Sequence, residues 1–408
     1  MEETLSVLAS EVEAELLENI LPFWMNHCVN EAHDGFYGAV ANKGEIYAGA
    51  PRASVITARV LWTFSKAYQL YPREAYQKMA DIAYCDLINH FYDSVNGGIF
   101  WNITHDGMPE IDGKQAYGQA FAIYGLAQYG EAFGRREPIA LAMELFACLE
   151  THFYDAKNGG YIEVLSRDWQ PVCETRLHTK GEHPQKTMNT NLHVMEAYTN
   201  LYRVTKDARV KAQLRALVEL TLSKIVNHST YGFNMFFDAE WNSLSSSNSF
   251  GHNIEGSWLL PEAADVLGDA QLSKRVREIS VKMADAVLAA GVDMEDNGIL
   301  GDTDNGVLRS RAKGWWPQAE GIIGFLNAYM LTKDQKYLTC SLRIWDYVKR
   351  VFCDHENGEW LYGSWRDVNR YPKKWRYFQC KAGRWKCPYH NSRMCMEVVE
   401  RAKLCGVR

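Results

Sequence analysis

The sequence predicts an all-α fold, an (α/α)6 barrel in which six outer helices surround six inner helices. A glycine-centred turn recurs six times at nearly constant spacing, and the segments between turns have the pattern of helix pairs. Repeated units bury their apolar faces against their neighbours, so a repeat architecture escapes the size limit of a single core. We therefore predict that residues 1–408 form one domain.

The six turns combine glycine with aromatic or aliphatic residues, as in NGGIFW at Asn96 and NGGYI at Asn158. Asn-Gly and Asp-Gly favour tight turns because glycine adopts positive φ angles at little steric cost. We expect short extended segments after them. The copies lie 60 to 73 residues apart, and their leading glycines are Gly35, Gly97, Gly159, Gly232, Gly298 and Gly358.

One helix of each pair precedes the turn and is amphipathic, with apolar residues near the 3.6-residue period. We expect these outer helices at residues 5–28, 73–92, 136–154, 207–229, 269–290 and 334–353. The inner helices follow each turn and are rich in Ala, Gly and aromatic residues, as in ASVITARVLWTFSKAY and WWPQAEGIIGFLNAYM. Their low charge is typical of helices buried on most sides.

An open α-solenoid would have the same periodicity, but it would expose a polar cap at each end. Six near-equal units and a helix-rich C-terminus ending at Leu404 favour a closed ring instead.

The net charge of the chain limits the classes of partner that we expect. The net charge is −6, whereas nucleic-acid and membrane surfaces attract basic proteins, so we expect neither as a partner. No apolar run approaches the roughly 20 residues that span a bilayer. The start, MEETLSVLAS, lacks the basic-then-apolar order of a secretory signal, and the ten cysteines show no CxxC spacing. We expect a cytoplasmic monomer.

Polar and aromatic residues gather where the inner helices begin. If these helices are parallel, their N-terminal ends open on the same side of the ring. Asn189 and His193 are four residues apart and His252 and Glu255 three apart, so each pair shares a helix face. The predicted mouth of the barrel therefore holds these residues: Arg59, Tyr117, Asn189, His193, His252, Glu255, Trp315, Trp316, Glu320 and His390.

Structural explanations compete with a catalytic role for these residues. A lone buried histidine is more often a hydrogen-bonded core residue, and we read His90 and His152, in matching HFYD segments, in that way. His193, His252 and His390 differ because they recur at one level of the repeat. Arg59 and Glu320 could form a structural ion pair, and Trp315 and Trp316 could be ordinary core rings.

A metal site is the other alternative, since imidazoles and carboxylates bind zinc and iron. The sequence has no HExxH motif, and the three histidines come from three separate helices. We therefore expect no metal and no organic cofactor.

Imidazoles that titrate near neutral pH suit proton abstraction beside a carbonyl group, such as C2 of an open-chain aldose. His252 and His390 could flank the sugar and invert C2 through an enediolate. Glu255, one turn from His252, would fix the tautomer of that ring. His193, Asn189 and Arg59 would stabilise the developing negative charge. An aldose–ketose isomerase, which needs one base on one face, stays open.

The segments KQAYGQAFAIY, MNTNLHVMEAY, SFGHNIEGSWLL, WWPQAE and WKCPYHNSRMCMEV resemble the N-acylglucosamine 2-epimerase superfamily, and most of all its cellobiose 2-epimerase branch. The resemblance covers essentially the whole chain. It implies a cofactor-free (α/α)6 barrel that epimerises the reducing-end glucose of β-1,4-linked disaccharides, cellobiose and also lactose, to mannose.

The resemblance also implies roles for individual residues. It makes His252 and His390 the acid/base pair, His193 an aid to ring opening or enediolate stabilisation, and Glu255 a support for His252. The positions that it implies as sugar contacts are Arg59, Tyr117, Asn189, Trp315 and Trp385. Trp385 lies five residues before His390, where it could stack on a second sugar ring.

One residue departs from the family pattern, and other activities remain open. Asn253 stands where the family often has Asp, but a neighbour of His252 points elsewhere on the helix, so we expect the chemistry to survive. A mannose or N-acylglucosamine 2-epimerase, a glycoside hydrolase of the same barrel and a non-catalytic sugar-binding protein remain alternatives. A hydrolase would need two flanking carboxylates, whereas this mouth offers mostly histidines.

Overall fold

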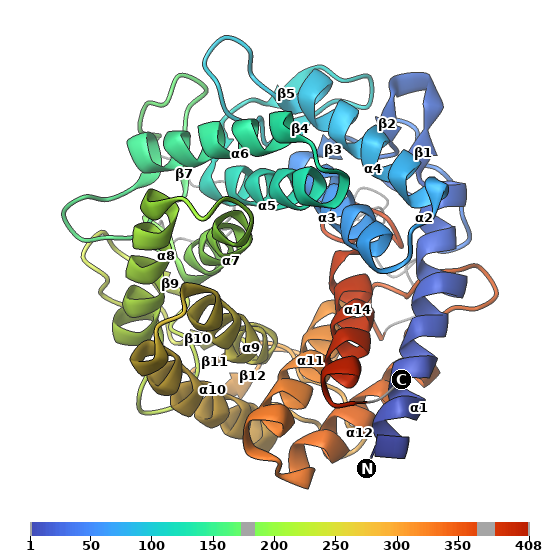
Figure 1. The fold of residues 1–408 in the computed structure, drawn as a ribbon, viewed down its shortest axis with the longest axis vertical. Coiled ribbons are helices and arrows are strands. Elements are labelled where there is room, and N and C mark those ends of the chain that lie inside the picture. The colour runs from blue at the N-terminus through green and yellow to red at the C-terminus, as the bar shows by residue number, and fades with distance from the viewer. Residues whose placement is uncertain (1, 173–183, 365–379, 407–408) are drawn as a thin grey trace.

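Two concentric rings of helices make up the computed structural model, which describes residues 2–172, 184–364 and 380–406 (Figure 1). The inner ring consists of α3 (Ser54–Leu70), α5 (Ala116–Phe133), α7 (Met188–Thr205), α9 (Phe250–Leu267), α11 (Trp315–Thr332) and α14 (Tyr389–Leu404). The outer ring consists of α1 (Glu2–Ala14) with α2 (Leu21–His27), α4 (Glu74–Asp86), α6 (Arg136–Cys148), α8 (Ala208–Leu220), α10 (Ala270–Ala290) and α12 (Gln335–Val351). The predicted (α/α)6 barrel is confirmed.

The outer helices of the first four units contain a π-helical turn. It joins α1 to α2 at Glu15–Ile20, and it ends the other three at Leu87–Phe91, Leu149–Phe153 and Thr221–Ile225. The HFYD segments lie at two of these ends. The His152 ring stacks on Trp169, with ring centroids 4.4 Å apart and an interplanar angle of 5°. His152 therefore takes part in packing, but as a half-buried, stacked ring and not in the hydrogen-bonded core position that we expected.

The ring is closed by contacts between the first and last units. α14 packs beside α3 and α1. Trp345 on α12 donates a hydrogen bond from Nε1 to Glu11 on α1 at 2.6 Å, and Trp360 donates to Glu15 at 2.9 Å. The first and last helices, α1 and α14, lie side by side in Figure 1. An open solenoid would leave both end units unpaired, so these contacts exclude that alternative.

Short strands connect neighbouring units, as the turns predicted. Most have two residues: β1 (Val29–Asn30), β2 (Gly35–Phe36), β3 (Arg52–Ala53), β4 (Asn102–Ile103), β5 (Pro109–Ile111), β6 (Lys114–Gln115), β7 (Val164–Leu165), β8 (Lys186–Thr187), β9 (Phe236–Phe237), β10 (Ser247–Asn248), β11 (Thr303–Asp304) and β12 (Val307–Leu308). The antiparallel pairs β3–β4, β6–β7, β8–β9 and β10–β11 each join a strand that leads into an inner helix to one in the next unit. These pairs set the inner helices at a common level.

A buried amide near the start of several inner helices ties that helix to the preceding turn. Gln119 accepts from the backbone of Ile99 at 2.8 Å and donates back to it at 2.7 Å. Asn191 and Gln318 do the same in their units. Asn253 accepts from the backbone of Phe233 at 2.8 Å. Asn253, the residue that departs from the family pattern, therefore has a structural role, and its side chain is turned away from the mouth of the barrel.

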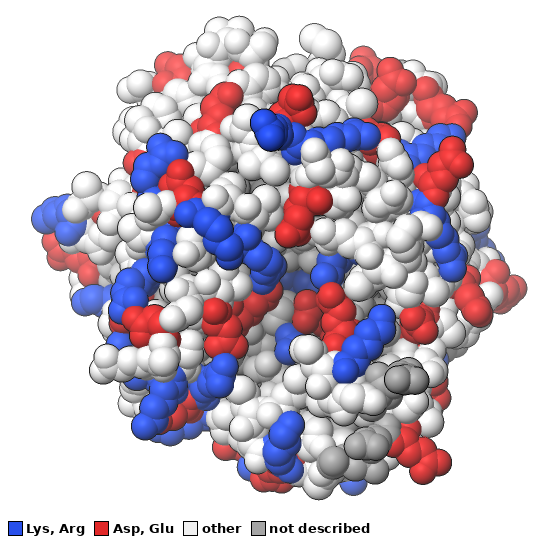
Figure 2. All heavy atoms as spheres, viewed as in Figure 1, with Lys and Arg blue, Asp and Glu red and all other residues white. Residues whose placement is uncertain are grey.

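The face on which the inner helices end carries mixed charge. Figure 2 shows Lys and Arg interspersed with Asp and Glu around a hollow on the axis of the ring. Among the described helices, none is long and apolar enough to cross a membrane.

Candidate active site

A cavity of about 190 Å³ lies at the N-terminal ends of the inner helices. Ten of the eleven residues predicted for the site line it. The eleventh, Glu320, is fully buried behind His390, and one further residue, Tyr362, was not predicted. The lining consists of Arg59, Tyr117, Asn189, His193, His252, Glu255, Trp315, Trp316, Tyr362, Trp385 and His390. The structure thus brings the predicted residues together, while their roles remain predictions.

His390 on α14 is paired with Glu320 on α11. The His390 Nδ1 lies 2.7 Å from Glu320 Oε1. Burial would raise the pKa of Glu320, but Arg393 and His390 lower it to about 2, so the carboxylate is ionised and Nδ1 must carry the hydrogen. Burial lowers the pKa of His390 to about 3 despite the opposing effect of Glu320. His390 is therefore neutral at neutral pH, with Nε2 left for a bound molecule.

His193 forms a second histidine–carboxylate pair. Its Nδ1 lies 2.7 Å from Oε2 of Glu196, three residues along α7. Burial would raise the pKa of Glu196, yet Arg393 and His193 lower it to about 2. Burial also lowers the pKa of His193, against the opposing effect of Glu196. The His193 ring packs on Tyr117 and Phe121, with centroid distances of 5.1 and 5.0 Å.

His252 is oriented differently from our expectation. Its Nδ1 lies 2.8 Å from the Ser249 hydroxyl, whereas Glu255 accepts a hydrogen bond from Arg393 at 2.9 Å. The prediction that Glu255 fixes the His252 tautomer is therefore wrong in this structure, because the arginine on α14 holds the carboxylate. Burial and the neighbouring His193 and His390 lower the pKa of His252 to about 3.

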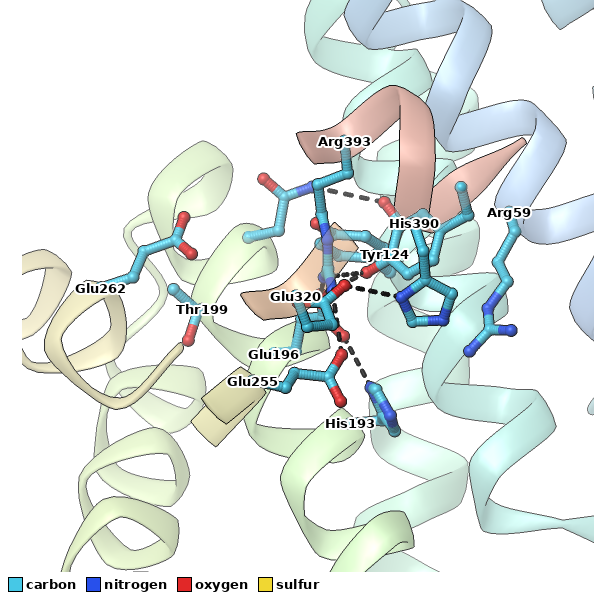
Figure 3. A network of polar contacts seen from close by, with 12 residues as sticks. Arg59, Tyr124, His193, Glu196, Thr199, Glu255, Glu262, Glu320, His390 and Arg393 are labelled. Carbon is cyan, nitrogen blue, oxygen red and sulfur yellow. Dashed lines mark hydrogen bonds and ion pairs between the residues drawn. The ribbon is translucent and has the colours of Figure 1, made fainter. Parts of the chain in front are cut away.

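Arg393 is the cation that the three carboxylates share. Figure 3 shows its guanidinium among Glu196, Glu255 and Glu320, with dashed contacts continuing to His193 and His390. Nη2 donates to Glu255 at 2.9 Å and to Glu320 at 2.8 Å, while Nη1 contacts Glu196. All four side chains are buried. Burial and the Glu320 charge raise the pKa of Glu255 well above its usual value, so Glu255 is the carboxyl group of the three that most readily holds a proton.

Three of these groups have spacings that a metal ion could use. Ligand atoms of Glu255, Glu320 and His390 lie within 4.8 Å of one another. However, Arg393 already donates to both carboxylates of this trio, and Glu320 also pairs with His390. The donor set is therefore committed to a guanidinium and an imidazole.

Arg59 belongs to an aromatic wall. Its Nη2 donates to the Tyr117 hydroxyl at 2.8 Å, and its guanidinium carbon lies 4.1 Å from the Phe121 ring centroid. The alternative of an Arg59–Glu320 ion pair is wrong, because Glu320 pairs with His390 and Arg393.

Several buried polar atoms at the cavity lack a partner within the described part of the chain. These atoms are Arg59 Nε, Asn189 Oδ1 and Trp315 Nε1. Buried polar groups are normally satisfied by hydrogen bonds. Their presence around one cavity indicates that a polar molecule completes them.

Aromatic rings form the remaining walls. Trp316 lies between the two histidines, with its ring centroid 4.7 Å from that of His252 and 5.6 Å from that of His390. Trp315 packs on Tyr362 at 4.6 Å. Both tryptophans line the cavity, so neither is only a core ring. Such walls suit the apolar faces of sugar rings.

Sequence reasoning missed Arg393, Glu196, Ser249 and Tyr362. The spacing rule that paired His252 with Glu255 would also have found Glu196, three residues after His193, and Arg393, three residues after His390. Ser249 precedes His252 by the same spacing. Tyr362 follows the sixth turn, outside the helix pattern, and nothing in that pattern pointed to it.

Known proteins resemble this chain over nearly its whole length. The sequence pattern of the N-acylglucosamine 2-epimerase (GlcNAc 2-epimerase) family matches residues 35–391. A cellobiose 2-epimerase from Bacteroides fragilis is 40% identical, over 96% of this chain and 99% of its own. A cellobiose 2-epimerase from Dictyoglomus turgidum is 35% identical, over 97% and 99%.

Solved structures agree with the sequence relatives. The structure of cellobiose 2-epimerase from Bacillus thermoamylovorans has a TM-score of 0.89 and 35% identity, and the match covers 97% of this chain and 99% of that one. A shared barrel alone would say little about activity. Here the family pattern, the identity of the relatives and the arrangement of the inner helices agree, and the chain therefore belongs to the N-acylglucosamine 2-epimerase family.

Proposed function

We propose that this protein is a cellobiose 2-epimerase, which inverts C2 of the reducing-end glucose of β-1,4-linked disaccharides such as cellobiose and lactose. Relatives bearing that name, at up to 40% identity over nearly full length, support the substrate class. Trp385 and Trp315 on the cavity wall support a disaccharide, because their rings can pack against sugar faces.

The observation that carries the mechanism is the arrangement of His252 and His390. Both rings pack against Trp316, both line one cavity, and each has its Nδ1 engaged by a protein oxygen. Each therefore presents Nε2 to the sugar. Because burial keeps both pKa values low, a neutral imidazole is available as the base that removes the C2 proton.

Inversion needs a second group that returns a proton to the other face of C2. His390 is the better proton carrier of the two, because its Nδ1–H points at an ionised carboxylate, whereas the partner of His252 is a neutral hydroxyl. The positively charged imidazolium is stabilised by Glu320 and by the negative charge that develops on the enediolate. When His252 removes the C2 proton, His390 must therefore take a proton from solvent at Nε2 and deliver it to the other face of C2, after which His252 releases its proton to solvent and both rings are neutral again.

The other lining groups stabilise the open-chain sugar. The Arg59 guanidinium and the Asn189 amide have unused hydrogen-bonding capacity at the cavity and would bind the oxygens of the enediolate. Glu255, whose pKa is raised well above its usual value, would donate a hydrogen bond to a sugar oxygen when it is protonated. His193, held by Glu196, would assist opening of the ring.

A product assay in heavy water tests this function. Cellobiose should give glucosyl-mannose that carries deuterium at C2 of the reducing unit. A ketose as the sole product would identify an aldose–ketose isomerase, and free glucose would identify a hydrolase.

His252→Ala and His390→Ala should each lower turnover by about 10²–10⁴-fold, the usual contribution of a general acid or base. His27→Ala, an exposed histidine outside the cavity, is the matched control.

A further inference from the structure

A second cavity, which shares no lining residue with the first, is formed by residues of β10, β11, α9 and α10 and of the loops beside them. Its volume is about 540 Å³. We call it the repeat-four groove. It is lined by Asn227, Thr230, Gly232, Phe233, Asn234, Ser245, Ser246, Ser247, Asn248, Phe250, Asn253, Ala286, Ala290, Thr303, Asn305 and Gly306. None of these residues is charged.

In two other units the corresponding space is filled by an indole. Trp169 donates from Nε1 to the carbonyl of Asn96 at 2.8 Å, and its ring lies so close to Gly98 that a Cβ there would be 2.5 Å away. Trp241 donates to the carbonyl of Gly159 at 3.1 Å and covers Gly160 in the same way. Each indole plugs the gap between one turn and the next.

In the repeat-four groove the plugging position is occupied by Gly306. This glycine precedes Gln318 by 12 residues, the spacing that separates Trp241 from Asn253. Its φ is 75°, close to the 69° of Trp241 and the 65° of Trp169. A Cβ on Gly306 would meet nothing within 4 Å. The side of the gap that an indole covers in the other two units is therefore open here, although the Asn248 amide covers Gly232 itself, with Oδ1 2.6 Å from the place of a Cβ on that glycine.

The charged pair that accompanies the plug is absent as well. Lys186 pairs with Asp155 at 2.7 Å, and Lys114 pairs with Asp93 at 2.9 Å. Asn248 and Asn227 stand at the corresponding positions of the fourth unit. They bond to neighbouring amides instead, with Asn253 donating to Asn248 at 2.7 Å. Long charged groups are thus replaced by short neutral ones.

We propose that the repeat-four groove is a second saccharide-binding site that holds one neutral pyranose ring where an indole lies in the neighbouring units. A pyranose chair is a compact ring that fits a space of the size of an indole, and its hydroxyls can both donate to and accept from amides and hydroxyls. An ionic ligand would find no counter-charge in this lining. This site lies beyond the proposed epimerase function.

Refilling the groove tests the proposal. Cellobiose titrated calorimetrically into full-length His390→Ala protein, in which turnover is blocked, should report two sites per chain. Gly306→Trp in that background should remove one site, or weaken it at least tenfold, about 1.4 kcal/mol. Gly306→Ala introduces the same backbone constraint without the indole and should keep both sites.

Two further measurements separate a filled groove from a misfolded protein and from a change in the active-site cavity. Ala290→Trp fills the groove from the exposed end of α10 and should act like Gly306→Trp. Gly306→Trp in the otherwise unchanged protein should epimerise cellobiose at a rate within about twofold of the parent, because the groove holds no reacting group. One site in the parent, or two sites in both filled variants, would overturn the proposal. Failure of the epimerase assignment would instead appear in the product assay.

Discussion

Buried charged side chains occur both in the turns between units and at the mouth of the barrel. The two regions differ in the ratio of cations to carboxylates. In the turns, one cation pairs with one carboxylate, as in Lys186 with Asp155, and the pairing lowers the pKa of Asp155 to about 2 although burial opposes it. At the mouth, three carboxylates share Arg393, and the pKa of one of them, Glu255, is raised well above its usual value. Balanced pairs hold neighbouring units together, whereas we propose that the unbalanced cluster takes part in proton transfer.

Of the variants that test this difference, removal of the Arg393 guanidinium should have the largest effect on stability and on kcat. Arg393→Met leaves the carboxylates without their cation, which should cost about 3–5 kcal/mol of unfolding free energy. It should also lower kcat more than about 100-fold, because both histidine–carboxylate pairs lose their anchor. Denaturant unfolding and steady-state kinetics measure the two effects.

The turn pair supplies the control for Arg393. Lys186→Met should destabilise the fold by a similar amount, yet leave the activity per folded molecule unchanged. Equal losses of kcat in both variants would show that the two regions do not differ in function.

Replacement of Glu320 should have the second-largest effect on kcat. Glu320→Gln keeps the shape but removes the charge that favours the His390 imidazolium, so kcat should fall about 100-fold while KM changes little. Glu163→Gln is a matched control, because the Glu163 side chain is similarly buried and, within the described part of the chain, accepts hydrogen bonds only from Thr187 and Thr190. A rise in KM with unchanged kcat in Glu320→Gln would assign Glu320 to substrate binding instead.

The pH profile should separate these histidines from ordinary ones. Because burial lowers the pKa of His252 and of His390 to about 3, both are neutral in the free enzyme well below the usual pKa of about 6.5. The acid limb of kcat/KM should therefore fall below about pH 5. An acid limb near pH 6.5 would contradict this account.

The low pKa values of these two histidines should also make the free energy of unfolding depend on pH. The unfolded chain protonates these histidines below about pH 6.5 while the folded chain resists protonation, so the unfolding free energy should decrease as the pH falls from 6.5 toward 3. Double replacement His252→Gln and His390→Gln should flatten that dependence in a denaturant titration.

Asn253→Asp should have the smallest effect. The carboxylate would keep the hydrogen bond from the Phe233 backbone but lose the one donated to Asn248. We expect kcat within about threefold of the parent and a loss of about 1 kcal/mol in stability. A larger change in kcat would show that this position influences His252.

Sequence periodicity predicted the barrel and the level at which the site lies, since the turns and the inner helices repeat along the chain. It also placed His193, His252 and His390 together. It did not predict that Glu320 pairs with His390 or that Arg393 holds Glu255, because one helix pattern does not give the rotation of its neighbours. Within one helix the spacing rule was available, and the missed Glu196 reflects its incomplete use.

The central claim is that His252 and His390 exchange protons with opposite faces of C2. Deuterium incorporation by single-histidine variants tests it most directly. In heavy water, His252→Asn and His390→Asn should each still exchange the C2 hydrogen of one epimer without inverting it, and the two variants should differ in which epimer exchanges. Exchange of the same epimer by both variants, or full epimerisation by either, would contradict the account.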